Sequence, residues 1–160
     1  MTATEKKINA LASFVMAKDE ESREIARKAL QAALKLKTEE ITVPDDAEQA
    51  IHDFLSEIGA PPHILGYRYA VYGILLALNH PEILDNITYR FYPDIAVKFD
   101  TTAYRVERAI RHLVESTFAG SDTDLLFNYF GNVVKPNSGK PTNACFIARS
   151  AIILKSRLKK

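Results

Sequence analysis

The sequence is poor in cysteine and has no long hydrophobic run. Its single cysteine, Cys145, cannot form a disulfide within the chain, and we expect a reducing, cytoplasmic setting. The longest mainly apolar stretch, residues 69–79, is shorter than the roughly 20 residues that cross a bilayer. Residues 1–7 are polar and mixed in charge, which is not the pattern of a secretory signal. These absences exclude a disulfide scaffold and predict a chain without a membrane partner.

The chain also lacks a strong excess of either charge, because its formal net charge is +1. Residues 1–50 hold 8 Lys/Arg and 10 Asp/Glu, or −2, whereas residues 51–160 hold 13 and 10, or +3. A basic excess favours a polyanionic partner, but it is often only a solvated surface. The content of 47% hydrophobic and 26% charged residues is typical of a globular chain that buries a core.

No pattern for catalysis or metal binding is present in the sequence. The four histidines are scattered, without an i,i+4 pair or a neighbouring cysteine, which argues against a metal site. They are His52, His63, His80 and His112. We find no nucleophile–base arrangement, no phosphate-binding glycine loop and no paired carboxylates in an apolar setting. We therefore expect neither an enzyme nor a bound cofactor.

Apolar residues recur every three to four positions almost throughout, and no convincing pair of strands is present. We predict an all-α fold in two parts, an N-terminal helical appendage at 1–45 and a main domain at 46–160. The appendage has two short amphipathic helices, which either dimerise the chain or dock on its own core. The helices predicted for the main domain are 47–58, 66–78, 86–99, 101–118, 123–130 and 141–158.

The segment 92–115 has the features of a helix-turn-helix. Ala96 is the small residue expected where the two helices touch, and Phe99 belongs to the buried side of the first helix. Asp100 and Thr101 form the predicted turn, and either side chain can cap the second helix. The glycine common in such turns is absent, but aspartate tolerates the left-handed conformation better than most residues.

The second helix of this motif separates into two faces. Its apolar stripe consists of Ala103, Val106, Ala109, Ile110, Leu113 and Val114. The rest is covered by Tyr104, Arg105, Glu107, Arg108, Arg111 and His112. Arginine can bond guanine in bidentate fashion and glutamate can accept from cytosine, whereas phosphate needs only positive charge. The same charges are typical of a solvated helix face with i,i+4 pairs, so both interpretations stay open at this point.

Three separate stretches carry a more specific pattern. They read YPDIA, KF, TTA and RVERAIRH within 92–112, then IGAP, HI and GY within 58–67, and KPTN and FIA within 140–148. In this order they strongly resemble the DNA-binding domain of the sporulation response regulator, stage zero sporulation protein A. The resemblance covers about residues 50–154.

This resemblance implies a six-helix domain that binds double-stranded DNA, with the fourth helix, 101–115, in the major groove. The positions matching Arg105, Glu107 and Arg108 read bases in the family, and the target is a short box with a G·C step flanked by A·T pairs. Two domains commonly bind in tandem. The family also activates or represses transcription and contacts RNA polymerase sigma factor near its fifth helix, here about 121–132.

The sequence departs from the family pattern at three places. Tyr104 stands where the family usually has serine, so its ring is expected to contact a thymine methyl or a phosphate, or to narrow the accepted sites. Leu65 replaces a frequent lysine, which removes one phosphate contact. Residues 1–45 are too short for the family's phospho-receiver domain, so we expect no phosphorylation-driven switch within this chain.

A further set of residues is expected to hold the DNA backbone. At the start of the last helix, free N–H groups, the helix dipole and Lys140 favour a phosphate. The alternative there is a plain helix start, with Pro141 early and a Thr or Asn cap. His63, in a loop, either touches phosphate or caps the next helix. The full expected set is Thr101, Thr102, Arg111, His112, His63, Lys140, Thr142 and Asn143.

The sequence therefore predicts a cytoplasmic transcriptional regulator that reads double-stranded DNA. The alternative is a protein-interaction module that binds or modulates another regulator and has lost DNA reading, an idea motivated by Tyr104 and by the missing receiver. A second alternative is a structural dimer unit with a merely basic surface helix, which the retained trio Arg105, Glu107 and Arg108 argues against.

Overall fold

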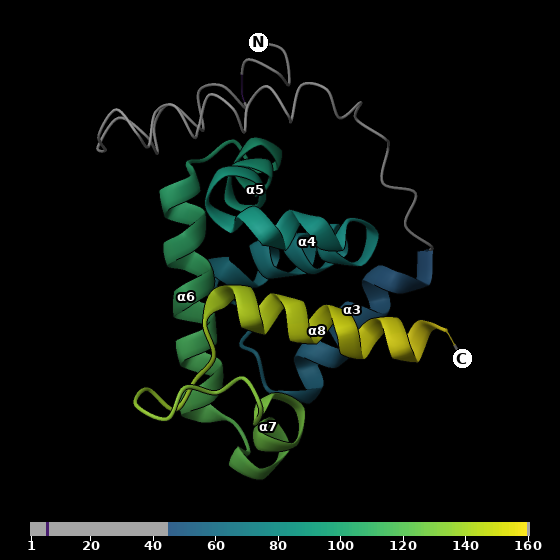
Figure 1. The fold of residues 1–160 in the computed structure, drawn as a ribbon, viewed down its shortest axis with the longest axis vertical. Coiled ribbons are helices and arrows are strands. Elements are labelled where there is room, and N and C mark those ends of the chain that lie inside the picture. The colour runs from purple at the N-terminus through teal and green to yellow at the C-terminus, as the bar shows by residue number, and fades with distance from the viewer. Residues whose placement is uncertain (1–5, 7–44, 160) are drawn as a thin grey trace.

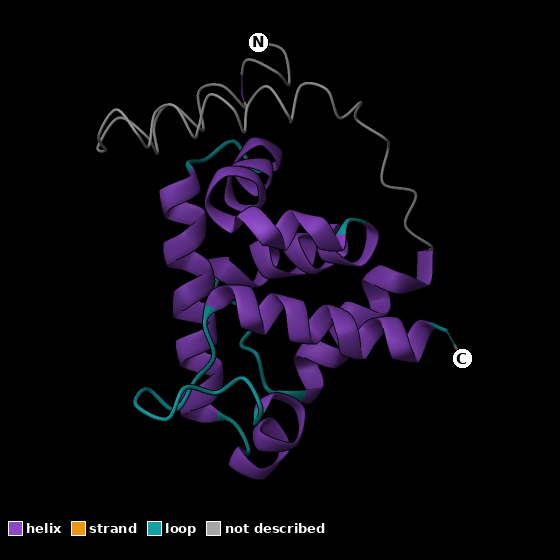
Figure 2. Cartoon of the chain, in the orientation of Figure 1, coloured by secondary structure: helices purple, strands orange, loops and turns teal. Residues whose placement is uncertain are grey.

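The structure, a computed structural model, describes Lys6 and residues 45–159. Every regular element within 45–159 is a helix, and no strand is present there (Figure 2). The all-α prediction is confirmed for this part of the chain. Apart from Lys6, the two helices predicted for the N-terminal appendage lie outside the described residues.

Six α-helices form the domain, as the sequence predicted. They are α3 (Asp45–Glu57), α4 (Leu65–Asn79), α5 (Tyr92–Lys98), α6 (Ala103–Gly120), α7 (Thr123–Phe130) and α8 (Asn143–Leu158). Their bounds follow local signals. Asp122, for example, caps α7 by accepting the N–H groups of Asp124 and Leu125 at 2.9 and 3.3 Å.

The single helix predicted over 86–99 is wrong. A 3-10 helix, η1 (Pro81–Asn86), is followed by a π-helical turn, η2 (Ile87–Phe91), and only then by α5. The side chain of Asn86 accepts the Tyr89 N–H at 3.3 Å, which starts a new helical segment. Pro93 has no N–H to donate to the preceding turn, and the N–H of Tyr92 instead reaches back five residues to Ile87.

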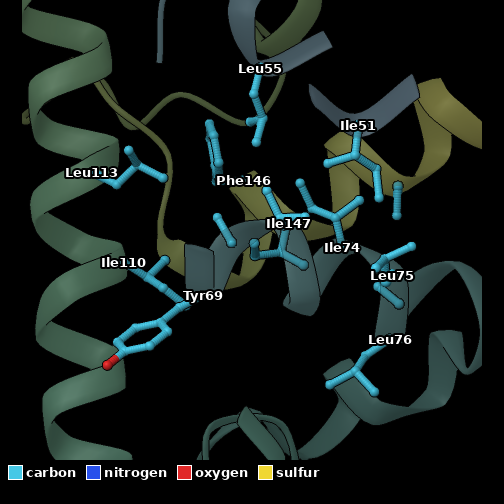
Figure 3. Close-up of a cluster of buried hydrophobic side chains, with 14 of the residues drawn as sticks. Ile51, Leu55, Tyr69, Ile74, Leu75, Leu76, Ile110, Leu113, Phe146 and Ile147 are labelled. Atoms are coloured by element: carbon cyan, nitrogen blue, oxygen red, sulfur yellow. The ribbon is translucent and has the colours of Figure 1, made fainter. Parts of the chain in front are cut away.

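The core lies where α4 is crossed by the other long helices (Figures 1 and 3). Helix α6 runs along one side of the molecule, α8 crosses it, and α3 closes the far side (Figure 1). Gly66 allows the closest approach: a Cβ there would lie 2.0 Å from the carbonyl oxygen of Ala109 in α6. The helices contribute fully buried side chains to this centre: Ile51, Leu55, Ile74, Ile110, Leu113, Phe146 and Ile147.

The connection between α5 and α6 is the predicted helix-turn-helix corner. Ala96 is buried at the contact, as expected. Asp100 adopts φ +53°, and the N–H of Thr101 closes α5 on the carbonyl of Ala96 at 2.9 Å. Neither of the two predicted caps, Asp100 and Thr101, is the cap of α6. Thr101 is used in closing α5, so Thr102 becomes the extended cap of α6, and its hydroxyl accepts the Arg105 N–H at 3.3 Å.

Candidate nucleic-acid interface

Helix α6 presents two faces, as its periodicity predicted. One face is buried against the core by Ala103, Val106, Ile110, Leu113 and Val114, while Ala109 is only half-buried. The other face exposes Tyr104, Arg105, Arg108, Arg111 and His112. A long helix thus offers a mainly cationic surface, held at a set angle by its apolar stripe.

Two arginines on this face are available for a ligand. Among residues 45–159, neither Arg105 nor Arg108 forms an ion pair with a carboxylate. The guanidinium carbon of Arg108 lies 5.7 Å from the ring centroid of Tyr104, a residue that is 55% exposed. The ring of Tyr104 therefore contacts Arg108 by a cation–π interaction, and the N–H groups of the guanidinium remain free to form hydrogen bonds with a ligand.

Glu107 is less exposed than the arginines around it, with 26% of its side chain accessible. Its carboxylate lies 3.7 Å from the guanidinium of Arg111, one helical turn further on. The i,i+4 pair that the sequence suggested is therefore present. A base that bonds Glu107 has to share this carboxylate with Arg111.

Asn143, the first residue of α8, joins three helices. Its side-chain NH₂ donates to the hydroxyl of Tyr92 in α5 at 3.1 Å and to the main-chain carbonyl of Glu107 in α6 at 3.2 Å. Both N–H groups of its side-chain amide are therefore already used. The remaining amide oxygen can only accept hydrogen bonds, so this side chain has no donor left for a phosphate. Burial, the largest cause, raises the pKa of Tyr92 to about 12.

This three-helix contact, formed by Asn143, Tyr92 and Glu107, was not expected from the sequence. The partners of Asn143 lie 51 and 36 residues away along the chain. No local spacing could have indicated them, because they depend on how α8 crosses α5 and α6. The contact places the start of α8 against the first half of α6, at Glu107.

Lys140 also meets α6. Its ammonium lies 2.6 Å from the carboxylate of Glu115, and this hydrogen bond is the main reason that the pKa of Glu115 is lowered. The expected interface residues at 101–112 and 140–143 are therefore brought together, although they are separated by about 30 residues of chain.

Two of the three threonines expected at the interface, Thr102 and Thr142, serve first as helix caps. The hydroxyl of Thr142 accepts the Cys145 N–H at 3.2 Å, which settles the choice between Thr and Asn as cap of α8. Pro141 lies just before this cap, outside the helix. Each capping hydroxyl still carries a proton that it can donate. Thr102 plays the same part in α6.

The start of α4 lies beside the same helix. His63 is exposed in the preceding loop, and it does not cap α4, whose cap residue Ile64 makes no side-chain cap hydrogen bond. Leu65 is 53% exposed, and its neighbour Gly66 touches the backbone of α6 at Ala109. His63 thus precedes by three residues the point where α4 approaches α6.

A metal site or a membrane span needs a grouping of residues that the described part of the chain does not contain. Within it, no three His, Cys, Asp or Glu residues gather closely enough to hold a metal ion. No helix there is both long and apolar enough to span a membrane. Cys145 is a free, half-buried thiol.

The chain was compared with models of known protein families. The family model described as "Sporulation initiation factor Spo0A C terminal" matches residues 51–154, which is more than half of the chain. The matched range agrees closely with the 50–154 range of the resemblance found in the sequence. It includes the second half of α3, the whole helix-turn-helix and most of α8.

Proposed function

The chain belongs to the Spo0A C-terminal family, and from that membership we propose how its helix-turn-helix reads DNA. Membership makes the chain a DNA-binding domain of the sporulation transcription-regulator type, which is not an enzyme family. The proposal is that α6 lies in the major groove of double-stranded DNA and that its exposed face recognises a specific sequence. A regulator of this kind acts in the cytoplasm, where the chromosome lies.

Base reading is assigned to the exposed side chains of the first half of α6. Arg105 and Arg108 each offer a guanidinium to guanine O6 and N7, and Glu107 accepts from cytosine N4. Tyr104 contacts a thymine methyl beside the base that Arg108 reads. One observation carries this assignment: the two arginines are exposed and have no carboxylate partner among residues 45–159.

Backbone binding is assigned to the rim of the same surface. Arg111, His112 and Lys140 supply positive charge, and the free main-chain N–H groups at the start of α8 supply donors. The side chain of Asn143 is committed to Tyr92 and Glu107, so only its main-chain N–H is proposed to face a phosphate. Hydroxyl donors and the loop histidine complete the set: Thr101, Thr102, Thr142 and His63.

Protein partners form a coarser part of the proposal. RNA polymerase sigma factor is proposed to contact the region 121–132, which contains α7. Phe127 on this helix is 68% exposed, an unusual state for a large apolar side chain, and such exposure favours a protein contact. Tandem binding of two copies on DNA, or a dimer formed through 1–45, is proposed as the mode of assembly.

The test begins with unbiased selection of bound duplexes by the full chain. The selected duplex is then titrated by fluorescence anisotropy with Arg105→Ala and Arg108→Ala. Each substitution is expected to cost about 1–3 kcal/mol and to relax specificity at one base pair. Lys155→Ala, which removes an exposed charge near the end of α8, is the matched control. Unchanged affinity and sequence preference in both arginine variants would refute the assignment.

A protein-interaction module without DNA reading is the second candidate. It is favoured by the exposure of two large apolar residues, Leu65 in α4 and Tyr104 in α6. This candidate predicts no salt-dependent DNA binding together with a tight protein partner. The anisotropy titration at two salt concentrations separates it from the first candidate.

A further inference from the structure

The cations of the proposed interface fall into two classes. Arg105 and Arg108, assigned to bases, have no carboxylate partner within residues 45–159. Arg111 and Lys140, assigned to the DNA backbone, each already hold a carboxylate: Arg111 lies 3.7 Å from Glu107 and Lys140 lies 2.6 Å from Glu115. These two phosphate-binding side chains are thus already paired with carboxylates before any DNA arrives.

The contact between Lys140 and Glu115 is built by the fold. The main-chain carbonyl of Lys140 accepts the Lys135 N–H at 3.1 Å and the Ser138 hydroxyl at 3.2 Å. These two hydrogen bonds from the preceding loop fix the backbone position of Lys140. Its ammonium then reaches across to α6. Glu115 lies 25 residues earlier in the chain and would otherwise be a solvated residue of a helix surface.

A carboxylate and a phosphate offer an ammonium group the same kind of bond, a charge-assisted hydrogen bond to an anionic oxygen. We propose that Glu115 lowers the DNA affinity of this domain, because its carboxylate binds the Lys140 ammonium that would otherwise bind a backbone phosphate. Its carboxylate must release the ammonium, or remain as a repelling neighbour of the phosphate, when DNA binds. The inference rests on the proposed function, because it requires that Lys140 meets DNA.

The size of the effect follows from the exposure of the pair. The side chains of Lys140 and Glu115 are 30% and 45% exposed, and solvent-exposed ion pairs contribute little. Removing the competitor is therefore expected to tighten DNA binding about two- to five-fold. Because phosphates occur in every sequence, the gain is the same for the selected duplex and for a shuffled one.

The experiment is a double-mutant cycle with Glu115→Gln, Lys140→Ala and the double variant. Affinity for the selected duplex and for a shuffled duplex is measured by anisotropy, and stability by urea unfolding. Glu115→Gln is expected to bind both duplexes more tightly by one common factor while unfolding at slightly lower urea. The gain is expected to shrink strongly in the Lys140→Ala background. Asp85→Asn, an exposed carboxylate in η1, controls for the change in net charge.

Opposite shifts in affinity and stability distinguish competition from a merely structural ion pair. Weaker binding by Glu115→Gln would overturn the inference, since it would mean that Glu115 positions Lys140 for DNA. An equal gain in the Lys140→Ala background, or in Asp85→Asn, would also overturn it in favour of general charge. If the wild-type chain shows no salt-dependent DNA binding, the proposed function itself falls and the inference falls with it.

Discussion

At the residue scale, the proposed DNA-reading surface of α6 depends on the side chains that contact each arginine. Arg108 rests on the ring of Tyr104, with 5.7 Å between the guanidinium carbon and the ring centroid. A long arginine side chain loses rotamer freedom when it binds a base, so a ring that already restricts it lowers that loss. Tyr104, where the resemblance led us to expect serine, is compatible with the proposed DNA reading in this arrangement.

Replacing Tyr104 separates the ring from the hydroxyl. We expect Tyr104→Leu to weaken binding of the selected duplex by about 0.5–1 kcal/mol, because the cation–π support of Arg108 is lost. Tyr104→Phe keeps the ring and should retain wild-type affinity. The measurement is an anisotropy titration of both variants. Equal losses in the two would assign the effect to the hydroxyl.

A second residue-scale prediction concerns Tyr92 and pH. Its pKa in the folded chain is about 12, raised chiefly by burial, against an ordinary value near 10. The folded state therefore keeps the phenol proton more strongly than the unfolded state does. The resulting stabilisation is complete below about pH 10 and is lost as pH rises toward 12, with a ceiling of about 2–3 kcal/mol.

Urea unfolding of wild type and Tyr92→Phe between pH 8 and pH 11.5 tests this. The variant is expected to be less stable by about 1 kcal/mol at pH 8, because the Asn143 donor loses its acceptor. The difference should shrink or reverse at high pH, since phenylalanine has no proton to lose. Parallel pH profiles for the two proteins would contradict the prediction.

At the element scale, the angle of α6 is set by close backbone contact as much as by side chains. Gly66 lets the start of α4 lie against the main chain of Ala109. In the turn between α5 and α6, Asp100 adopts the left-handed conformation, with φ +53°, that glycine usually adopts there. Together they hold the second helix of the motif against α4 and α5.

Adding one methyl group at Gly66 should disturb this arrangement. The new Cβ would lie 2.0 Å from the Ala109 carbonyl oxygen, so α4 and α6 must separate. We expect Gly66→Ala to lower the free energy of unfolding by about 2 kcal/mol or more and to weaken DNA binding. Gly120→Ala is the matched control, because a methyl group at that position would meet no neighbour within 4 Å. Equal stability of the two variants, measured by urea unfolding, would sink the idea.

At the scale of the whole molecule, a cluster of side chains around Arg157 joins the end of α8 to α3 and α7. Arg157, in the last turn of α8, donates to the Glu57 carboxylate of α3 at 2.9 Å and to the Tyr129 hydroxyl of α7 at 2.7 Å. Its guanidinium also stacks near Phe54, 5.4 Å from the ring centroid. One side chain thus ties together three helices that are up to 100 residues apart.

We expect Arg157→Ala to lower stability by about 1 kcal/mol, a modest value because the ion pair is partly exposed. Arg157→Lys keeps the charge but loses the planar contacts, so it should recover only part of that loss. DNA affinity is expected to stay unchanged in both, since Arg157 lies about 20 Å along α8 from its start. Urea unfolding and anisotropy measure the two effects, and a loss of affinity in the folded variants would contradict their separation.

The sequence by itself determined the helices, the helix-turn-helix and the two faces of α6. Those features are local: a period of 3.6 residues, a small residue such as Ala96, and caps such as Asp122 each act over a few positions. Even here, the interruption of 86–99 and the cap at Thr102 were missed. Both depend on how hydrogen bonds are shared between adjoining turns.

Only the tertiary structure decided which groups of the proposed interface are free and which are already bound. Asn143 has its partners 36 and 51 residues away, and Lys140 meets Glu115 across 25 residues. Such pairs exist because buried side chains and the contact at Gly66 set the crossing of α4, α6 and α8. A sequence pattern records which side chains share a helix face, whereas helix packing determines which charge opposes which.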